Sequence, residues 1–564
     1  MQSPNSDTLN KLNRRQAILL TAAAGMGAAL NGCASTSAGI TPSARQQSGS
    51  CSTPRSAVAK TQYGKVRGYV EDGVLTFKGV PYGADTGGEN RWLPAKPPAA
   101  WEGELPALTY GANCPQRLHN WSSEQTFLQQ WTDGWQSEDM LKVNIWTPGL
   151  TGKHPVMFYI HGGGFSFGSA YELASQDGAQ MARHHDVVSV TVNHRLNILG
   201  FFDVSSIGGS AYADSVNVGM TDLVEALRWV RDNIANFGGD PGCVMIYGQS
   251  GGGSKVTTLM GMPSAEGLFH RASAQSGGSG DAPSAAQSKE YARRVCAKLG
   301  VKDIAALQKM GWSRLNEIGN AVAAKMNPPM GVYGPIAPPG IEKPRVGWGP
   351  TVDGRIITMR SFFDAAPEIS KDIPMLIGSV SEEGNSMLSR PTEAEWRATL
   401  TKSYGEAKAT ALIAAMKKAH PEKSIRKLSY MCNGSGLNTF NICNNALRMA
   451  TMKYEQKGAP VFTWYFSWQS PMLEDSGAWH TAELAFCFDN TKRCEQGTGN
   501  GPEAQALAKK MATAWANFAR TGNPSQSGLA WDSFDPARCQ TMVFDNNCRM
   551  VDDPEGEVRK ILLT

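Results

Sequence analysis

A chain of 564 residues with 41% apolar and 18% charged residues can bury a core large enough for stability without metals or disulfides. The formal net charge of +4 is small for this length, and nucleic-acid binding, which needs a clustered basic face, is not expected. The length fits two or three domains, or one large α/β domain with insertions.

The first 34 residues have the composition of an export signal. Lys11, Arg14 and Arg15 form a basic head, and an apolar run over residues 17–30 follows. This run is shorter than the ~20 residues that span a bilayer. Arg14 and Arg15 together resemble a twin-arginine signal, so we expect the protein to be exported.

Residues 30–33, Leu-Asn-Gly-Cys, resemble a bacterial lipobox. Lipidation of Cys33 makes the protein a periplasmic or outer-membrane-anchored lipoprotein of a bacterium, and cleavage after Ala34 stays an open alternative. Contact with a membrane is expected only through Cys33. Residues 35–57 are rich in Ser, Thr, Gly, Gln and Pro, which predicts a flexible tether. The folded domain is expected over residues 58–564.

Export permits disulfides, and the chain has 11 cysteines, ten of which remain if Cys33 is lipidated. Cys243 opens an apolar run and is expected to be a buried free thiol. No spacing predicts a zinc site. Connectivity does not follow from sequence, but short spacings favour three pairs: Cys432 with Cys443, Cys487 with Cys494, and Cys539 with Cys548.

Segments with β character over residues 60–66 and 73–80 flank a turn at residues 71–73, which predicts an N-terminal antiparallel hairpin. Short apolar strands then alternate with helices. This alternation predicts an α/β fold, with a large, mostly parallel central sheet and helices on both faces. No internal repeat or long linker is present, so we expect one large domain. The expected strands span residues 156–160, 187–192, 243–247, 375–380 and 461–468, and the expected helices span residues 218–234 and 254–262.

Residues 248–252, Gly-Gln-Ser-Gly-Gly, fit the G-x-S-x-G nucleophile elbow of the α/β-hydrolase fold. Glycines on both sides of the serine let a strand and a helix approach each other at a sharp turn. The motif alone is weak, because 60 glycines produce chance matches. Here an apolar strand precedes it and a helical stretch follows it. We therefore expect Ser250 to be a nucleophile.

A serine hydroxyl needs an oxyanion hole and a base to react. Residues 161–165, His-Gly-Gly-Gly-Phe, follow an expected strand and match the glycine loop that supplies backbone donors in lipases and esterases. We assign the backbone N–H groups of Gly163, Gly164 and Gly251 to the oxyanion hole.

Nine histidines compete for the role of base. His480 lies late in the chain, after the last expected strand, and the chain order serine, acid, histidine is that of the α/β-hydrolase fold. The acid should follow a strand between Ser250 and His480. Glu382 and Glu383 directly follow the strand over residues 375–380, and spacing does not decide between them.

Together these residues resemble the type B carboxylesterase family, and the resemblance covers about residues 61–545. It implies the α/β-hydrolase fold, Glu383 as the triad acid and His480 as the base. It also places Ser276 and Gln249, the residue directly before the nucleophile, beside the triad, and implies no metal and no organic cofactor. The matching stretches are residues 138–146, 193–196, 217–222, 237–241, 248–253, 515–524 and 531–545.

The chain departs from this family at several positions. Met140 replaces a cysteine that usually pairs with the one matching Cys114, and Val301 stands where a second disulfide usually begins. Gln249 replaces a frequent glutamate, which removes a negative charge beside the nucleophile and disfavours choline esters. Trp131 and Trp135 are out of register with the choline-binding tryptophan and are interpreted as aromatic cover over the gorge.

The sequence therefore predicts a serine hydrolase that cleaves small-molecule carboxylic esters through an acyl-serine intermediate. The alternatives are a lipase for long acyl chains and a non-catalytic binding protein on the same fold. The substrate does not follow from the sequence, because the sequence does not give the positions of the loops that line the expected gorge, over residues 121–136 and 326–349. Neither does the oligomeric state.

Overall fold

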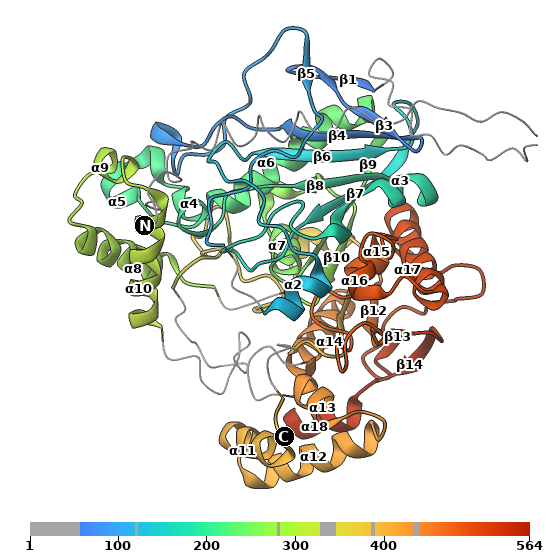
Figure 1. Cartoon of the computed structure of the whole chain (residues 1–564). Coiled ribbons are helices and arrows are strands. Elements are labelled where there is room, and N and C mark those ends of the chain that lie inside the picture. The colour runs from blue at the N-terminus through green and yellow to red at the C-terminus, as the bar shows by residue number, and fades with distance from the viewer. Residues whose placement is uncertain are drawn as a thin grey trace, which may run out of the picture. The chain divides into compact units, whose positions relative to one another are not determined.

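The computed structural model describes residues 57–118, 122–278, 282–327, 346–384, 390–432 and 439–563. All of them belong to one compact unit, residues 50–564 (Figure 1). The predicted export signal, Cys33 and all of the predicted tether except Ala57 lie outside the described residues, as does most of the loop over residues 326–349.

An 11-stranded sheet, in the order β14-β13-β12-β11-β10-β9-β7-β8-β6-β4-β3, forms the centre of the fold (Figure 1). The strands from β13 to β8 in this order run parallel, and the strands outside this block pair antiparallel. The predicted α/β fold with a mostly parallel sheet is confirmed. The strands are β3 Tyr69–Glu71, β4 Val74–Pro81, β6 Lys142–Thr147, β7 His154–Ile160, β8 Val188–Val192, β9 Gly239–Gln249, β10 Arg271–Gln275, β11 Met375–Val380, β12 Val461–Phe466, β13 Gln540–Phe544 and β14 Arg549–Asp552.

Alternate residues of the central strands belong to two different apolar cores, because successive side chains of a strand point to opposite faces. Phe158 of β7 belongs to the core that contains residues of α6, α7 and α14, and its neighbour Tyr159 belongs to the core of α3, α15 and α17. Both faces of the sheet are therefore covered. These helices are α3 Ala179–His185, α6 Val218–Asn233, α7 Gly251–Met260, α14 Thr439–Glu455, α15 Leu484–Cys487 and α17 Pro502–Thr521.

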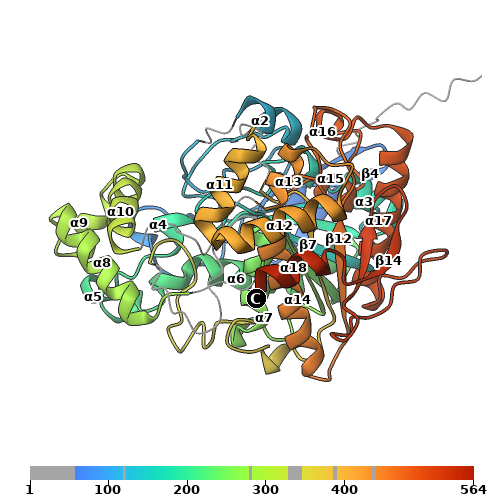
Figure 2. The same ribbon diagram turned by 90° about the horizontal axis from the view of Figure 1, so that it is seen from below.

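Most of the other helices form two groups at the periphery of the sheet. Helices α11 Glu393–Tyr404, α12 Glu406–Ala419, α13 Ile425–Met431 and α18 Gly556–Leu563 lie together (Figures 1 and 2). Helices α8 Ala285–Leu299, α9 Ile304–Gln308 and α10 Trp312–Met326 form the second group (Figures 1 and 2). Single-turn or short helices are α2 Ser123–Gln129, α4 Asn197–Gly200, α5 Ser205–Gly208 and α16 Glu495–Thr498. Among the described residues, no helix is both long and apolar enough to span a membrane.

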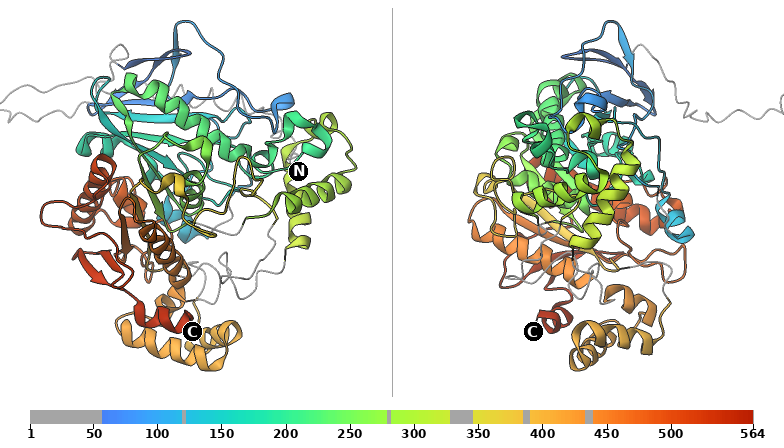
Figure 3. Two further views of the ribbon diagram at one scale, coloured as in Figure 1. Left: turned by 180° about the vertical axis from the view of Figure 1, so that it is seen from behind. Right: turned by 90° about the vertical axis from the view of Figure 1, so that its left-hand side faces the viewer.

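The N-terminal strands differ from the predicted hairpin. The predicted strand over residues 60–66 is wrong, because a turn at Gln62 and Tyr63 divides it into β1 Val58–Thr61 and β2 Gly64–Arg67, which pair antiparallel. The turn after Glu71 is confirmed and joins β3 to β4; its Asp72 and Gly73 both have positive φ (47° and 83°). β1 and β2 form a separate three-stranded sheet with β5 Glu104–Pro106, at the end opposite α11 and α12 (Figure 3).

The three predicted disulfides are wrong, because none of the six cysteines is bonded to its predicted partner. Short spacing in sequence does not bring Cβ atoms together when the residues lie on different elements, as Cys432 beyond α13 and Cys443 within α14 do. Burial raises the pKa of Cys443 to about 12, which keeps it protonated. Cys243 is free as predicted but only half-buried, and its Sγ donates to the carbonyl of Ala519 (3.3 Å).

The segment between Cys114 and Met140 contains no disulfide in its described part. Cys114 is buried and free, and its Sγ accepts a hydrogen bond from the N–H of Leu196 (3.3 Å). Near Met140, the guanidinium of Arg91 binds both carboxylate oxygens of Glu138 (2.7 and 2.5 Å). A bidentate ion pair therefore anchors the chain two residues before Met140.

Candidate active site

Ser250 occupies the sharp turn between β9 and α7. Its φ of 58° and ψ of −122° lie outside the regions that ordinary residues prefer, as expected for a strained nucleophile elbow. A Cβ on Gly248 would lie 2.5 Å from the carbonyl carbon of Gly252, and a Cβ on Gly252 would lie 2.9 Å from the carbonyl oxygen of His161. Only glycine therefore permits this close approach of strand, helix and loop.

The end of β10 and the loop after it contact the backbone of this turn. The N–H of Ser250 donates to the carbonyl of Gln275 (2.8 Å). A Cβ on Gly277 would overlap the carbonyl oxygen of Ser250 and lie 2.7 Å from its carbonyl carbon. Ser276 lies between them, buried and with a positive φ of 47°, and its Oγ has no partner among the described residues. The structure thus places Ser276 beside the nucleophile elbow.

The glycine loop after β7 contacts the same turn. A Cβ on Gly251 would lie 2.5 Å from the nitrogen of Gly164, and one on Gly162 would lie 3.4 Å from Cβ of Ser250. Gly163 and Gly164 have positive φ (78° and 61°), which glycine adopts at no steric cost. The backbone N–H groups of Gly163, Gly164 and Gly251 have no acceptor within the described part of the chain. Three donors are therefore available beside Ser250.

His480 is hydrogen-bonded through Nδ1 to Oε2 of Glu383. The Glu383 side chain is fully buried, and its Oε1 accepts from the N–H of Val380 (3.1 Å). Burial lowers the pKa of His480, but the charge and the hydrogen bond of Glu383 outweigh it, so the pKa is raised above 6.5. A carboxylate only accepts hydrogen bonds, so Nδ1 carries a proton and Nε2 of the neutral ring is left as an acceptor.

Gln249 faces the second nitrogen of this ring. Its Nε2 lies 3.1 Å from Nε2 of His480, and no hydrogen bond joins Ser250 to His480 among the described residues. The amide N–H₂ of Gln249 can donate to the imidazole lone pair that a serine hydroxyl would otherwise use. Gln249, which was predicted to lie beside the triad, is thus in contact with the imidazole ring.

Glu382 has different partners. Its carboxylate contacts the amine of Lys423 and the hydroxyl of Ser381, and it accepts from the N–H of Ala478 at 2.8 Å. Its side chain is fully buried. Glu382 therefore ties the segment that carries His480 to the end of β11, whereas Glu383 contacts the imidazole ring.

Glu483 lies three residues after His480, and the sequence analysis did not identify it as part of the site. Burial, together with the charge of Glu383, raises the pKa of Glu483 to about 8, so this carboxyl is protonated at neutral pH. Its Oε1 accepts a hydrogen bond from Gln275 (3.4 Å). An acidic residue in an otherwise apolar stretch, residues 482–488, was the available signal.

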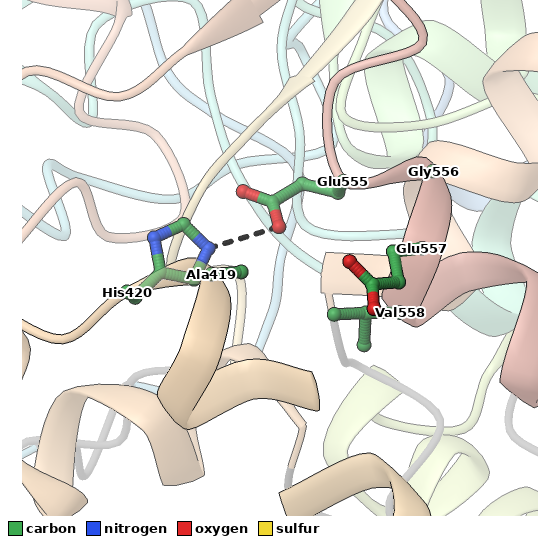
Figure 4. Close-up of a pocket in the computed structure, with 6 residues that line it drawn as sticks. All are labelled: Ala419, His420, Glu555, Gly556, Glu557 and Val558. Carbon is green, nitrogen blue, oxygen red and sulfur yellow. Dashed lines mark hydrogen bonds and ion pairs between the residues drawn. The ribbon is translucent and has the colours of Figure 1, made fainter. Parts of the chain in front are cut away.

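The predicted aromatic cover is divided between two environments. Trp131 packs edge-on against Phe167, with ring centroids 6.4 Å apart, just beyond the glycine loop. Trp135 is 58% exposed. A separate pocket of about 250 Å³ is lined by Ala419, His420 and residues 555–558 and contains none of the predicted site residues (Figure 4).

Comparison with known proteins gives consistent results. A model of the carboxylesterase family matches residues 55–559. The chain is 31% identical to para-nitrobenzyl esterase of Bacillus subtilis, over 90% of this chain and 98% of that protein. It is 32% identical to phenmedipham hydrolase of Pseudarthrobacter oxydans, over 85% and 94% of the two chains.

Solved structures agree with these sequence matches. An esterase from Clostridium hathewayi, described as able to hydrolyse aliphatic aromatic polyesters, has a TM-score of 0.76 and 33% identity over 89% of this chain and 97% of its own. Its similarity extends over nearly all of the described domain. The chain belongs to the carboxylesterase family, with the α/β-hydrolase fold, and is a carboxylic ester hydrolase.

Proposed function

We propose that the protein cleaves esters through an acyl intermediate on Ser250, with His480 as the base and Glu383 as the residue that orients it. The observation that carries this proposal is the hydrogen bond between the buried Glu383 and His480. This pair belongs to the same site as a strained serine with three unpartnered amide groups beside it. The arrangement supplies a nucleophile, a base and an oxyanion hole together.

The first step forms the acyl-enzyme. Oγ of Ser250 displaces the amide of Gln249 from Nε2 of His480, gives its proton to that nitrogen and attacks the ester carbonyl carbon. Catalytic hydrogen bonds of this kind commonly form only when substrate is bound. The tetrahedral intermediate then breaks its bond to the alkoxide, which takes the proton from His480 and leaves as the alcohol.

The second step regenerates the enzyme. Water gives a proton to Nε2 of His480 and attacks the acyl carbon, and Ser250 leaves with that proton as the carboxylic acid is released. In both steps negative charge develops on the carbonyl oxygen, and the N–H groups of Gly163, Gly164 and Gly251 stabilise it. Removing one such donor typically lowers turnover by ~10²–10³.

The test is Ser250→Ala, which should lower kcat for p-nitrophenyl esters by about 10⁶, as in other serine hydrolases. Mass spectrometry after treatment with an organophosphate should find one adduct, at Ser250. Ser254→Ala is the matched control, because Ser254 lies one turn further along α7 and should not change labelling or kcat. Hydrolysis that persists in Ser250→Ala refutes the proposal and favours either another nucleophile or the non-catalytic alternative.

We propose uncharged esters as the substrate class. Gln249 is neutral, Glu383 is paired with His480, and the pKa of Glu483 is raised to about 8, so no free carboxylate faces a cationic alcohol among these residues. One relative is named para-nitrobenzyl esterase, which supports small aromatic esters.

A matched pair of substrates tests this class. The kcat/KM for 3,3-dimethylbutyl acetate should equal or exceed that for acetylcholine, which has the same shape and a positive charge. A clear preference for acetylcholine would contradict the assignment. A p-nitrophenyl ester series from C2 to C16 addresses the lipase alternative, which requires kcat/KM to be largest for the long acyl chains.

A further inference from the structure

A buried amine lies behind the predicted oxyanion hole. Lys255 is in α7, five residues after Ser250, and is 0% exposed. Lysine is almost never fully buried unless it is paired, yet Lys255 has no ion pair among the described residues. Burying an amine without a counter-ion costs free energy of folding. The contacts of Lys255 should show what this buried amine does.

These contacts lead to the glycine loop. Nζ of Lys255 donates to the carbonyl oxygen of His161 (3.0 Å) and to that of Gly162 (3.4 Å). It also lies 5.5 Å from the ring centroid of Phe165, at the other end of the loop. Both ends of the loop that contains Gly163 and Gly164 are therefore in contact with one side chain.

Peptide geometry connects these carbonyl groups to the expected donors. The peptide bond is planar and trans, and no cis bond occurs in the described chain, so the C=O of Gly162 and the N–H of Gly163 point in opposite directions. A donor that binds this C=O from behind directs the N–H of Gly163 away from itself. Hydrogen bonds in series also polarise one another, which strengthens the donor.

The helix adds a second geometric link. α7 begins with Gly251, the third expected donor, and carries Lys255 one turn later. The same rigid element therefore positions Ser250, one donor of the hole and the amine that binds the opposite loop. Movement of the loop relative to the helix would break the contacts of Lys255.

We propose that Lys255 is a positioning residue of the oxyanion hole, which binds the outer carbonyl groups of the glycine loop and keeps the Gly163 amide directed at the reacting carbonyl oxygen. This inference rests on the proposed function, since it needs the hole to be used. Lys255 does not touch the substrate, so its effect is on the rate of the chemical step rather than on substrate binding.

The charge of Lys255 is expected to depend on pH. Burial lowers its pKa to about 7, and the charge of Glu172 opposes this effect. Burial likewise raises the pKa of Glu172 to about 7. The other titratable groups around the amine are His161 and His194, whose rings stack 5.1 Å apart and whose pKa values are lowered, mainly by burial, so both are neutral.

The test is Lys255→Met, with Lys453→Met as its matched control. Lys453 in α14 is also 0% exposed and also donates to two consecutive main-chain carbonyl groups, those of Ser370 (3.0 Å) and Lys371. These groups precede β11, at the amino ends of the parallel strands, whereas Ser250 follows the carboxyl end of β9. Both substitutions thus remove the same kind of buried contact, one near the site and one away from it.

Lys255→Met should lower kcat for p-nitrophenyl acetate by about 10- to 100-fold, less than the ~10²–10³ lost with a whole donor. KM should stay within about threefold, since ground-state binding is unaffected. The affinity for a trifluoromethyl ketone, which forms an anionic adduct with the serine, should fall by the same factor as kcat. Lys453→Met should keep kcat and inhibitor affinity even where it lowers the melting temperature equally.

Wild-type kcat and inhibitor affinity in Lys255→Met, or an equal loss in Lys453→Met, would overturn the inference. If Lys255→Met does not fold, Glu172→Gln replaces it. The charged amine binds the loop carbonyl groups more strongly than the neutral amine, so kcat should decline as pH rises and Lys255 loses its proton. The charge of Glu172 raises the pKa of Lys255, so Glu172→Gln should move this decline to lower pH. An unchanged pH profile contradicts the inference. Activity of Ser250→Ala separates the two failures, because its persistence refutes the proposed function itself.

Discussion

Replacing Glu382 and Glu383 by glutamine, one at a time, should separate two adjacent buried carboxylates with different roles. Glu383 contacts the ring of His480, whereas Glu382 contacts Lys423 and the N–H of Ala478. Glutamine has nearly the same shape as glutamate, so each substitution removes a charge and leaves the packing in place. The two variants should therefore fail in different assays.

The expected magnitudes follow from these contacts. In Glu383→Gln the neutral amide no longer stabilises the imidazolium or fixes its tautomer, and kcat should fall by about 10⁴, as for the corresponding change in a serine protease triad. In Glu382→Gln the amine of Lys423, with only 9% of its side chain exposed, is left buried without its partner. Such a broken pair typically costs about 3–5 kcal/mol of the free energy of unfolding.

Two measurements on each variant decide the matter: kcat with p-nitrophenyl acetate and urea unfolding followed by fluorescence. Glu382→Gln should keep kcat within about tenfold and unfold at lower urea. The double variant Glu382→Gln/Lys423→Met should recover much of the lost stability, because it no longer buries an unpaired amine. The reasoning is refuted if Glu382→Gln loses as much turnover as Glu383→Gln, or if Glu383→Gln keeps a tenth of wild-type kcat.

Three further outcomes are expected. The kcat/KM should decline as pH falls through a midpoint above 6.5, because the raised pKa of His480 means that the ring is already protonated, and no longer a base, at that pH. Glu383→Gln removes the charge that raises this pKa and should move the midpoint to lower pH. Gly277→Ala should lower kcat by about 10², because the new Cβ would lie 2.7 Å from the carbonyl carbon of Ser250 and displace the nucleophile. An unchanged kcat would contradict this close approach of the two backbones. Burial lowers the pKa of His420, but the contact of His420 with Glu555 (2.9 Å, Figure 4) outweighs burial and raises this pKa above 6.5. The contact therefore stabilises the fold below pH 6.5, and this stabilisation is lost as the pH rises through the raised pKa. Glu555→Gln should therefore lower the free energy of unfolding more at pH 5.5 than at pH 8.5, and an equal loss at both would contradict this linkage.

Much of the central sheet was predictable because its strands are short apolar runs bounded by glycine or polar residues. The strand over residues 375–380 matches β11, and the predicted helix over residues 218–234 ends one residue beyond α6. The helix expected to begin at Ser254 in fact begins at Gly251. Three consecutive glycines hide a helix start in sequence, because glycine has low helix propensity and only the close contact with the glycine loop favours it here.

Pairings between distant residues were less predictable. The turn at Asp72 and Gly73 follows from local residue preferences, but its partner strand was misassigned because the turn at residues 62–63 has no strong signal. The cysteine pairs failed for a related reason: spacing says how close two residues are along the chain, not which way their Cβ atoms point.

The sequence by itself determined the fold class, the family and the candidate residues Ser250, His480 and the glycine loop, because these are local patterns or ordered motifs. Spacing left Glu382 and Glu383 equivalent, and within the sequence only the resemblance to the family favoured Glu383. The tertiary structure shows that Glu383 meets His480 and that Lys255 lies behind the glycine loop. The two glutamates differ only once β11 and the segment around Ala478 are packed together, which points one carboxylate at an imidazole and the other at an amine.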